Sequence, residues 1–190
     1  MKERPQAIWR EMIPEPPATL SVVHWQWLCD ADSLTKRLQH LLADRIQFCL
    51  VSEGIAELAQ DECEILGFAL PHPECWVRHI EWRFCGELWI TARTVLPLQS
   101  SNPLLRTIGG VPIGKYLFQP GTYQRGPIEI AELQPRDDFC RYLKIPLSLL
   151  PATLWGRRSL FCLANEKLLV SEVFFPAFFQ YTFAHESCYE

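Results

Sequence analysis

Two charged side chains stand in otherwise apolar strand patterns, and their types suit the binding of a polar ligand. The stretch KLLVSEVFFPAFF, residues 167–179, has a single charge after Lys167, which is Glu172. In CWVRHIEWRF, residues 75–84, alternation across a strand places Arg78 on a face with two tryptophans, an isoleucine and a phenylalanine. Because burying an isolated charge costs several kcal/mol, each of these residues needs a partner or a cavity.

The residues alone leave two explanations open. Arg78 and Glu172 could form a buried structural ion pair, although such pairs often add little net stability. They could instead line an internal pocket, where the rigid donor fork of arginine suits a carboxylate. A glutamate in an apolar pocket tends to have a raised pKa, so it could donate a proton or bond a hydroxyl group.

The elements that must position these residues are predicted to be strands of an antiparallel sheet in an α+β fold. Turn-like links, CGE and NE, join two pairs of strands into hairpins. The stretch DADSLTKRLQHLL predicts a helix that Asp32 or Ser33 caps. The predicted strands cover residues 45–54, 75–84, 88–98, 122–133, 157–164 and 167–175, and the predicted helices lie near 22–43, at 111–118 and within 136–150. The second face of residues 75–84 is predicted to be compatible with solvent and carries Val77, His79, Glu81 and Arg83.

Composition narrows the class of protein. The 190 residues, 48% of them hydrophobic and 21% charged, suit one globular domain with a core. A net charge of −4 argues against a broad nucleic-acid surface. No apolar run reaches the roughly 18 residues of a membrane helix, and the N-terminus lacks the apolar core of a signal peptide. We therefore expect a cytoplasmic protein, a monomer without stable membrane insertion.

Cysteine and histidine spacing gives no strong metal or disulfide signal. None of the eight cysteines forms a CxxC pair, and reduced core cysteines are the expectation without a secretion signal. His72 and Cys75 have ligand spacing, with His79 nearby, but a closed zinc site needs more ligands. No cofactor is expected, because the motifs for nucleotides and metalloproteases are also absent.

A series of motifs within residues 25–177 resembles one family. In order they are DADSLTKRL, WVRHIEW, LWITARTVLP, VPIGKYLF, IEIAEL, WGRRS and KLLVSEVFFP. Each is weak alone, but together they resemble chorismate pyruvate-lyase, the bacterial enzyme that converts chorismate into 4-hydroxybenzoate and pyruvate at the start of ubiquinone biosynthesis. The resemblance implies one antiparallel sheet of about six strands, with helices packed on one side, that encloses an internal ligand cavity.

The resemblance also implies roles for particular residues. Arg78 would clamp the ring carboxylate, Glu172 would face the ring hydroxyl, and backbone groups at Leu34 and Ile113 would line the cavity. It implies chorismate as the substrate, no cofactor, and transfer of the product to a membrane prenyltransferase.

Chorismate carries a second carboxylate, and the motif WGRRS offers two candidates to bind it. Arg157 and Arg158 are adjacent, so on a strand they point to opposite faces and at most one should enter the site. The alternative is the backbone N–H groups of VPIG, because helix N-termini attract anions.

Three segments lie outside the compact pattern of the family, within a single domain of residues 1–190. They are an N-terminal arm at 1–20, an insertion at 134–154 and a C-terminal extension at 178–190. The insertion could be a lid over the site, a surface for a partner, or a segment without a functional role. The aromatic residues of the tail could pack in the core or form a contact surface.

Two other functions compete with the lyase. The ligand-binding domains of some transcriptional regulators look similar, so a non-catalytic sensor of aromatic carboxylates is one. The short stretch before residue 25 leaves no room for their DNA-binding domain of about 60 residues. The other is a different chorismate-processing enzyme on the same fold, which the identity of the product would distinguish.

Overall fold

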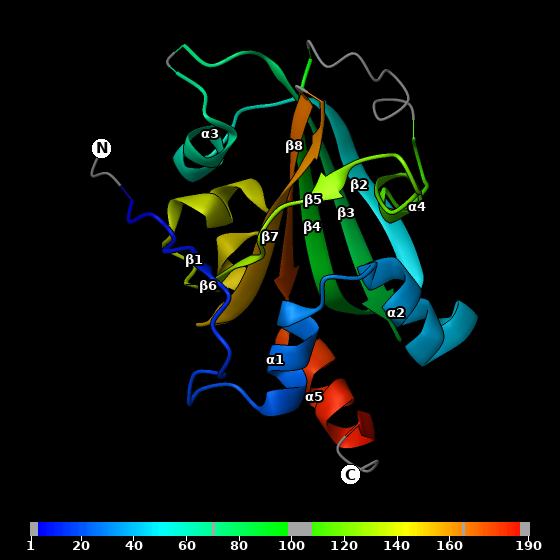
Figure 1. The fold of residues 1–190 in the computed structure, drawn as a ribbon. Helices are drawn as coiled ribbons and strands as arrows, with labels where there is room; N and C mark the ends of the chain where they lie inside the picture. The colour runs from blue at the N-terminus through cyan, green and yellow to red at the C-terminus, as the bar shows by residue number, and fades with distance from the viewer. Residues whose placement is uncertain (1–3, 70, 99–107, 165, 187–190) are drawn as a thin grey trace.

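One antiparallel sheet forms the centre of the fold. The computed structural model describes residues 4–69, 71–98, 108–164 and 166–186. Its strands run in the order β1-β6-β7-β8-β4-β3-β2, with β5 paired to β7 (Figure 1). The strands are β1 (Arg10–Glu11), β2 (Gln47–Ile55), β3 (Cys75–Phe84), β4 (Glu87–Pro97), β5 (Gln124–Arg125), β6 (Glu129–Leu133), β7 (Leu154–Leu163) and β8 (Glu166–Phe174).

The α+β class is confirmed, but the eight-stranded sheet is larger than the six strands expected. The predicted strand 122–133 is divided into β5 and β6. The other additional strand, β1, has two residues, too few to produce an alternating pattern. In the β3–β4 hairpin, Cys85 and Gly86 have φ values of 51° and 83°, as a two-residue type I′ turn requires. In the second hairpin, Glu166 was expected in the turn but begins β8, while Asn165 lies outside the described residues.

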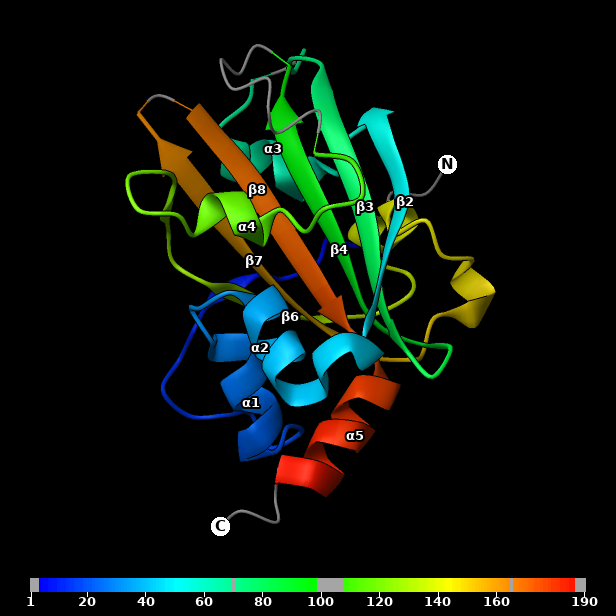
Figure 2. The same ribbon diagram turned by 90° about the vertical axis from the view of Figure 1, so that its right-hand side faces the viewer.

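Helices cover both faces of the sheet, so the expected packing on one side is wrong (Figures 1 and 2). α2 and α4 lie over one face, whereas α3 lies over the other. Arg93 of β4 binds the Glu62 carboxylate of α3. The next residue, Thr94, points to the other face, where it lines a pocket with residues of α2 and α4. The helices are α1 (Val22–Cys29), α2 (Leu34–Leu42), α3 (Gln60–Leu66), α4 (Gly114–Leu117) and α5 (Pro176–Glu186), with 3₁₀ helices at Ala43–Arg45, Asp138–Tyr142 and Leu147–Leu149.

The second face of β3 is buried at its centre, which contradicts the solvent-compatible face expected there. Val77 and His79 are 2% and 1% exposed, because α3 and residues 134–154 cover this side of the sheet. His79 Nε2 donates a hydrogen bond of 2.5 Å to the backbone oxygen of Tyr142 in the covering segment. Phe139 and Cys140 of that segment are fully buried, so residues 134–154 contribute to the core.

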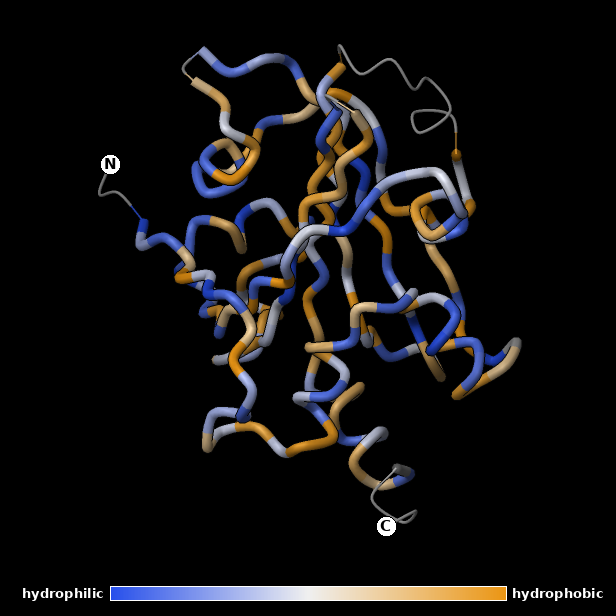
Figure 3. The backbone as a smooth tube through the Cα atoms, in the orientation of Figure 1, coloured by the Kyte–Doolittle hydropathy of each residue, from blue (hydrophilic) through white to orange (hydrophobic). Residues whose placement is uncertain are grey.

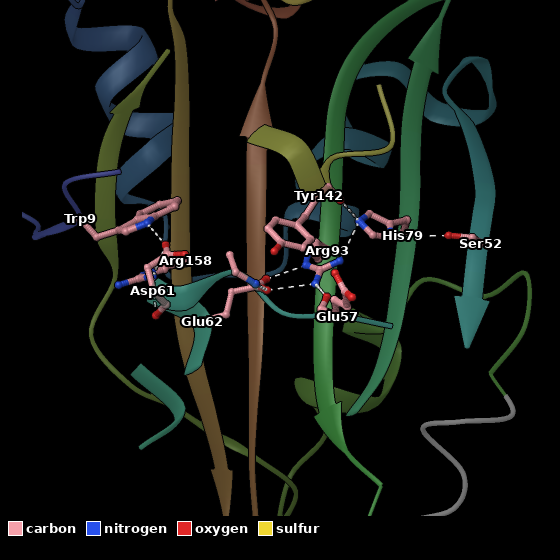
Figure 4. Close-up of polar contacts among 10 residues, drawn as sticks. Trp9, Ser52, Glu57, Asp61, Glu62, His79, Arg93, Tyr142 and Arg158 are labelled. Carbon is pink, nitrogen blue, oxygen red and sulfur yellow. Dashed lines mark hydrogen bonds and ion pairs between the residues drawn. The ribbon is translucent and has the colours of Figure 1, made fainter. Parts of the chain in front are cut away.

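Polar and apolar residues alternate along the strands (Figure 3), and one polar row crosses the face beneath α3 (Figure 4). Arg93 donates two hydrogen bonds to the Glu62 carboxylate, with Nε–Oε1 and Nη2–Oε2 distances of 2.6 and 3.0 Å. Arg158 donates to Asp61 at 2.9 Å, and Trp9 Nε1 donates to the same carboxylate at 2.5 Å. Ion pairs therefore attach α3 to the sheet, and a hydrogen bond from Trp9 attaches the N-terminal arm to α3. The row of register neighbours is Ser52, His79, Arg93, Ser171, Arg158 and Glu129.

The C-terminal helix α5 closes one end of the sheet. Phe178 is fully buried and packs edge-on against Trp27 and Trp89, at centroid distances of 4.9 and 5.5 Å. The tail aromatics Phe174 and Phe178 are therefore part of the core. Among the helices of the described segments, none is long and apolar enough to cross a membrane.

Acid is expected to destabilise this fold through His79. Burial and the nearby Arg93 cation lower the His79 pKa from 6.5 to about 3. Between these values the unfolded chain binds a proton that the folded state excludes, so stability is lost as the pH falls below 6.5. Between pH 7 and pH 5 the expected loss in unfolding free energy is about 2 kcal/mol.

The test is denaturant unfolding of His79→Gln at both pH values. Glutamine keeps an N–H donor for Tyr142 but does not titrate, so the acid-dependent loss should shrink by this amount. His40 is exposed, and His40→Gln is the matched control that should retain the wild-type pH dependence. An unchanged acid sensitivity in His79→Gln would assign the effect to other groups.

Candidate functional site

A pocket lies between the sheet and the segments that contain α2 and α4. Its apolar wall includes side chains of Phe48, Ile80, Trp82, Phe161 and Val170. Flat rings and branched aliphatic groups of this kind suit a six-membered carbon ring. Its charged lining residues are Asp32, Arg78, Arg125, Arg157 and Glu172.

Arg78 is held in this pocket as a buried cation. The side chain is 2% exposed, and Nη2 donates to the backbone oxygens of Gly109 and Val111 at 2.5 and 2.8 Å. Its nearest carboxylate is Glu53, 3.7 Å from Nε, and within the described chain this Nε has no hydrogen-bond partner. Burial lowers the Arg78 pKa, and the charge of Glu53 partly opposes this. A buried guanidinium with an unused donor is suited to an anionic ligand.

Glu172 forms an ion pair with Arg157, not with Arg78. The register places Arg157 directly opposite Glu172 on β7, and the Nε–Oε2 distance is 2.6 Å. Arg157 is 1% exposed and also donates through Nη1 to the backbone oxygens of Trp27 and Asp30. The alternative of an Arg78–Glu172 ion pair is therefore wrong.

The sheet register explains how Arg78 and Glu172 share a pocket without pairing. Ala92 of β4 lies between Glu172 of β8 and Ile80 of β3, and Arg78 is two residues from Ile80. Two strand spacings of about 5 Å and this offset separate the two backbones by roughly 12 Å. Long side chains that converge from these positions can grip the two ends of one small ring.

A family model described as chorismate lyase matches residues 6–183. The chain belongs to the chorismate lyase family. A probable chorismate pyruvate-lyase of Coxiella burnetii is 31% identical over 177 residues, covering 92% of this chain and 94% of that protein. A probable chorismate pyruvate-lyase of Pseudomonas putida is 37% identical over 159 residues, 81% of this chain and 80% of the relative. The chorismate pyruvate-lyase of Erwinia tasmaniensis is 31% identical, with 88% and 86% coverage.

Similarity to solved structures outside the chorismate lyase family concerns the fold. A GntR-family transcriptional regulator from Bacillus cereus aligns with a TM-score of 0.50 over 70% of this chain and 94% of that one. The sequence identity is 11%, so the match indicates a shared fold and nothing about function.

The structure brings five of the six predicted site residues together. Leu34, Arg78, Ile113, Arg157 and Glu172 all line the pocket. Arg158 lies on the opposite face, where it binds Asp61 and Glu129. Side-chain alternation along β7 separates the two adjacent arginines in this way.

Sequence reasoning did not identify Arg125 as a pocket residue. Arg125 lies in the short strand β5, and its Nε donates to Ser159 Oγ at 3.0 Å. Its Nη1 donates to the backbone oxygens of Ala31 and Asp30 at 2.9 and 3.3 Å. Burial and then the neighbouring Arg157 cation lower the Arg125 pKa. The available signal was that Arg125 is the sole basic residue in the predicted strand 122–133.

Proposed function

We propose that this protein is a chorismate pyruvate-lyase that converts chorismate into 4-hydroxybenzoate and pyruvate. The observation that carries the proposal is that Arg78 and Glu172 reach one largely apolar pocket from separate strands. Membership of the chorismate lyase family supports the same substrate. The pocket combines a cation for a ring carboxylate with a carboxylate that can accept a hydrogen bond from a ring hydroxyl.

The reaction requires little from the protein beyond orientation and proton handling. The ether bond between ring carbon 3 and the enolpyruvyl oxygen breaks, and carbon 4 loses its proton. The electron pair of that C–H bond completes the aromatic ring, and the departing enolpyruvate gains a proton to become pyruvate. Aromatisation supplies the driving force, so the protein has to orient a dianion, exclude water and assist one proton transfer.

Each pocket residue then has a role in this step. Arg78 binds the ring carboxylate. Glu172 accepts a hydrogen bond from the hydroxyl on carbon 4 and assists the proton transfer as a general acid or base. Arg157 holds the Glu172 carboxylate in place through the 2.6 Å ion pair. Backbone groups at Leu34 and Ile113 close the pocket over the ring.

The test is incubation of the purified protein with chorismate, with enzymatic detection of pyruvate and identification of the aromatic product. Equimolar pyruvate and 4-hydroxybenzoate are expected. Binding of 4-hydroxybenzoate without pyruvate release would instead favour the sensor alternative. Pyruvate with a different aromatic product would identify another chorismate-processing enzyme.

Replacing Arg78 with lysine is expected to weaken the binding of 4-hydroxybenzoate by roughly 1–3 kcal/mol. Lysine keeps the positive charge but loses the planar donor fork that holds a carboxylate. It also cannot hold the Gly109 and Val111 carbonyls in the same geometry. Isothermal titration calorimetry measures the effect, and an unchanged affinity would remove Arg78 from the site.

The proposed function also implies a setting. The resemblance to chorismate pyruvate-lyase implies the first step of ubiquinone biosynthesis, after which a membrane prenyltransferase takes the product. The cytoplasm is the setting expected from the sequence, which has no predicted membrane helix or signal peptide. We propose the same setting here, with the protein acting as a monomer.

A further inference from the structure

The pocket holds three arginines, and one of them lacks a carboxylate partner. Arg157 is paired with Glu172 at 2.6 Å, and Arg78 has Glu53 at 3.7 Å. In the described ranges, Arg125 has no carboxylate within 4.0 Å and is bonded only to neutral oxygens. A partly buried cation with neutral partners leaves positive potential that an anionic ligand can neutralise.

The guanidinium of Arg125 is fixed in orientation before any ligand arrives. Ser159 Oγ accepts from Nε, and the Asp30 and Ala31 carbonyls accept from Nη1. The guanidinium carbon lies 5.5 Å from the ring centroid of Phe161, another pocket residue. Within the described chain Nη2 of Arg125 has no hydrogen-bond partner, so this donor can bind a ligand. Because the side chain is already ordered, ligand binding costs little of its conformational entropy.

The strand order places Arg125 at the end of the pocket remote from Arg78. The sequence of strands from Arg78 is β3, β4, β8, β7 and then β5, with Glu172 on β8 between the two arginines. In chorismate the ring carboxylate is on carbon 1, opposite the hydroxyl on carbon 4. The enolpyruvyl group is on carbon 3, so with Arg78 and Glu172 at carbons 1 and 4 it can extend toward Arg125.

We propose that Arg125 binds the enolpyruvyl carboxylate of chorismate and is the residue that distinguishes the dianionic substrate from the monoanionic product. This inference rests on the proposed function and adds a specificity residue to it. Arg78 binds the ring carboxylate, which substrate and product share. Arg125 binds the enolpyruvyl carboxylate, which leaves with pyruvate. Removing the Arg125 side chain should therefore weaken the binding of chorismate but not of 4-hydroxybenzoate.

The experiment compares Arg125→Met and Arg125→Lys with the wild-type protein. The KM for chorismate should rise roughly 10- to 100-fold in Arg125→Met, as expected for a lost charge-assisted hydrogen bond. The dissociation constant of 4-hydroxybenzoate should change less than about threefold, and lysine should restore part of the substrate affinity. Arg141→Met removes an exposed charge that pairs with Asp138 outside the pocket, and it should leave both values unchanged.

The other outcomes overturn the proposal. Equal weakening of substrate and product would mean that Arg125 only holds the loop at Asp30 and Ala31. Unchanged affinity for both would exclude contact with the second carboxylate. If the wild-type protein releases no pyruvate, the proposed function fails separately. Chorismate itself is then titrated onto wild type and Arg125→Met, and equal affinities reject the role of Arg125 whereas weaker binding by the variant supports it.

Discussion

Replacing Glu172 with glutamine is expected to lower kcat for chorismate by about 10²-fold or more, the usual loss for a general acid or base. The amide keeps the size of the carboxylate and can still bond the ring hydroxyl, so product affinity should stay within roughly 1–2 kcal/mol of wild type. Stability should also fall, because Arg157 is buried and loses its charged partner. Steady-state kinetics, product titration and thermal unfolding measure the three quantities.

The chain offers a matched control on the neighbouring arginine. Glu129 pairs with Arg158 at 2.7 Å, much as Glu172 pairs with Arg157 at 2.6 Å, but on the opposite face of the sheet. Glu129→Gln should therefore reduce stability without a large change in kcat. A loss of turnover smaller than about tenfold in Glu172→Gln would mean that Glu172 only positions the hydroxyl, with the proton moving within the substrate. Wild-type turnover in this variant would remove Glu172 from the chemistry.

The strands that carry Arg78 and Glu172 could be predicted because a half-buried strand has a period of two and hairpin turns have local signals. The ion-pair partner of Glu172, however, could not be predicted. An expected turn at residues 165–166 is one residue later than the observed register, in which Leu163 pairs with Glu166. A shift of this kind changes every cross-strand neighbour, and only the observed register sets Arg157 against Glu172.

The elements on the second face could not be predicted for a different reason. α3 has the sequence QDECEIL, which is short and carries no amphipathic period. It is held by ion pairs such as Glu62 to Arg93, which join residues 31 positions apart in the chain. The charges on alternating positions of residues 75–84 therefore suggested solvent, although in the structure His79 on this face is buried and contacts Tyr142 and Arg93. Arg125 lay in the predicted strand 122–133, but its place beside the pocket depends on the pairing of β5 with β7, which the local sequence does not specify.

Replacing Glu62 with leucine is expected to destabilise the fold by about 3–5 kcal/mol, the range for removing one partner of a buried ion pair. Glu62 and Arg93 are 0% and 1% exposed, and their two hydrogen bonds lie beneath α3. Leucine leaves the guanidinium of Arg93 with the Glu57 carbonyl and no carboxylate. It also removes the acceptor for the Ala59 N–H. Denaturant unfolding gives the free energy.

Two further variants separate the ion pair from other effects of the substitution. Asp138→Asn breaks the exposed pair with Arg141 and should change stability far less, because solvent screens exposed ion pairs. The double variant Glu62→Leu with Arg93→Met should recover much of the loss, because an apolar replacement of both partners leaves no uncompensated charge. A double variant as unstable as the sum of its singles would contradict the ion-pair account.

The single variant Glu62→Leu tests whether α3 also positions the site. Ala92 and Thr94, on either side of Arg93, face the pocket. The kcat of Glu62→Leu is therefore measured below the unfolding transition of the variant. A kcat within about twofold of wild type, the scatter expected when no transition-state contact is lost, would assign α3 to stability alone.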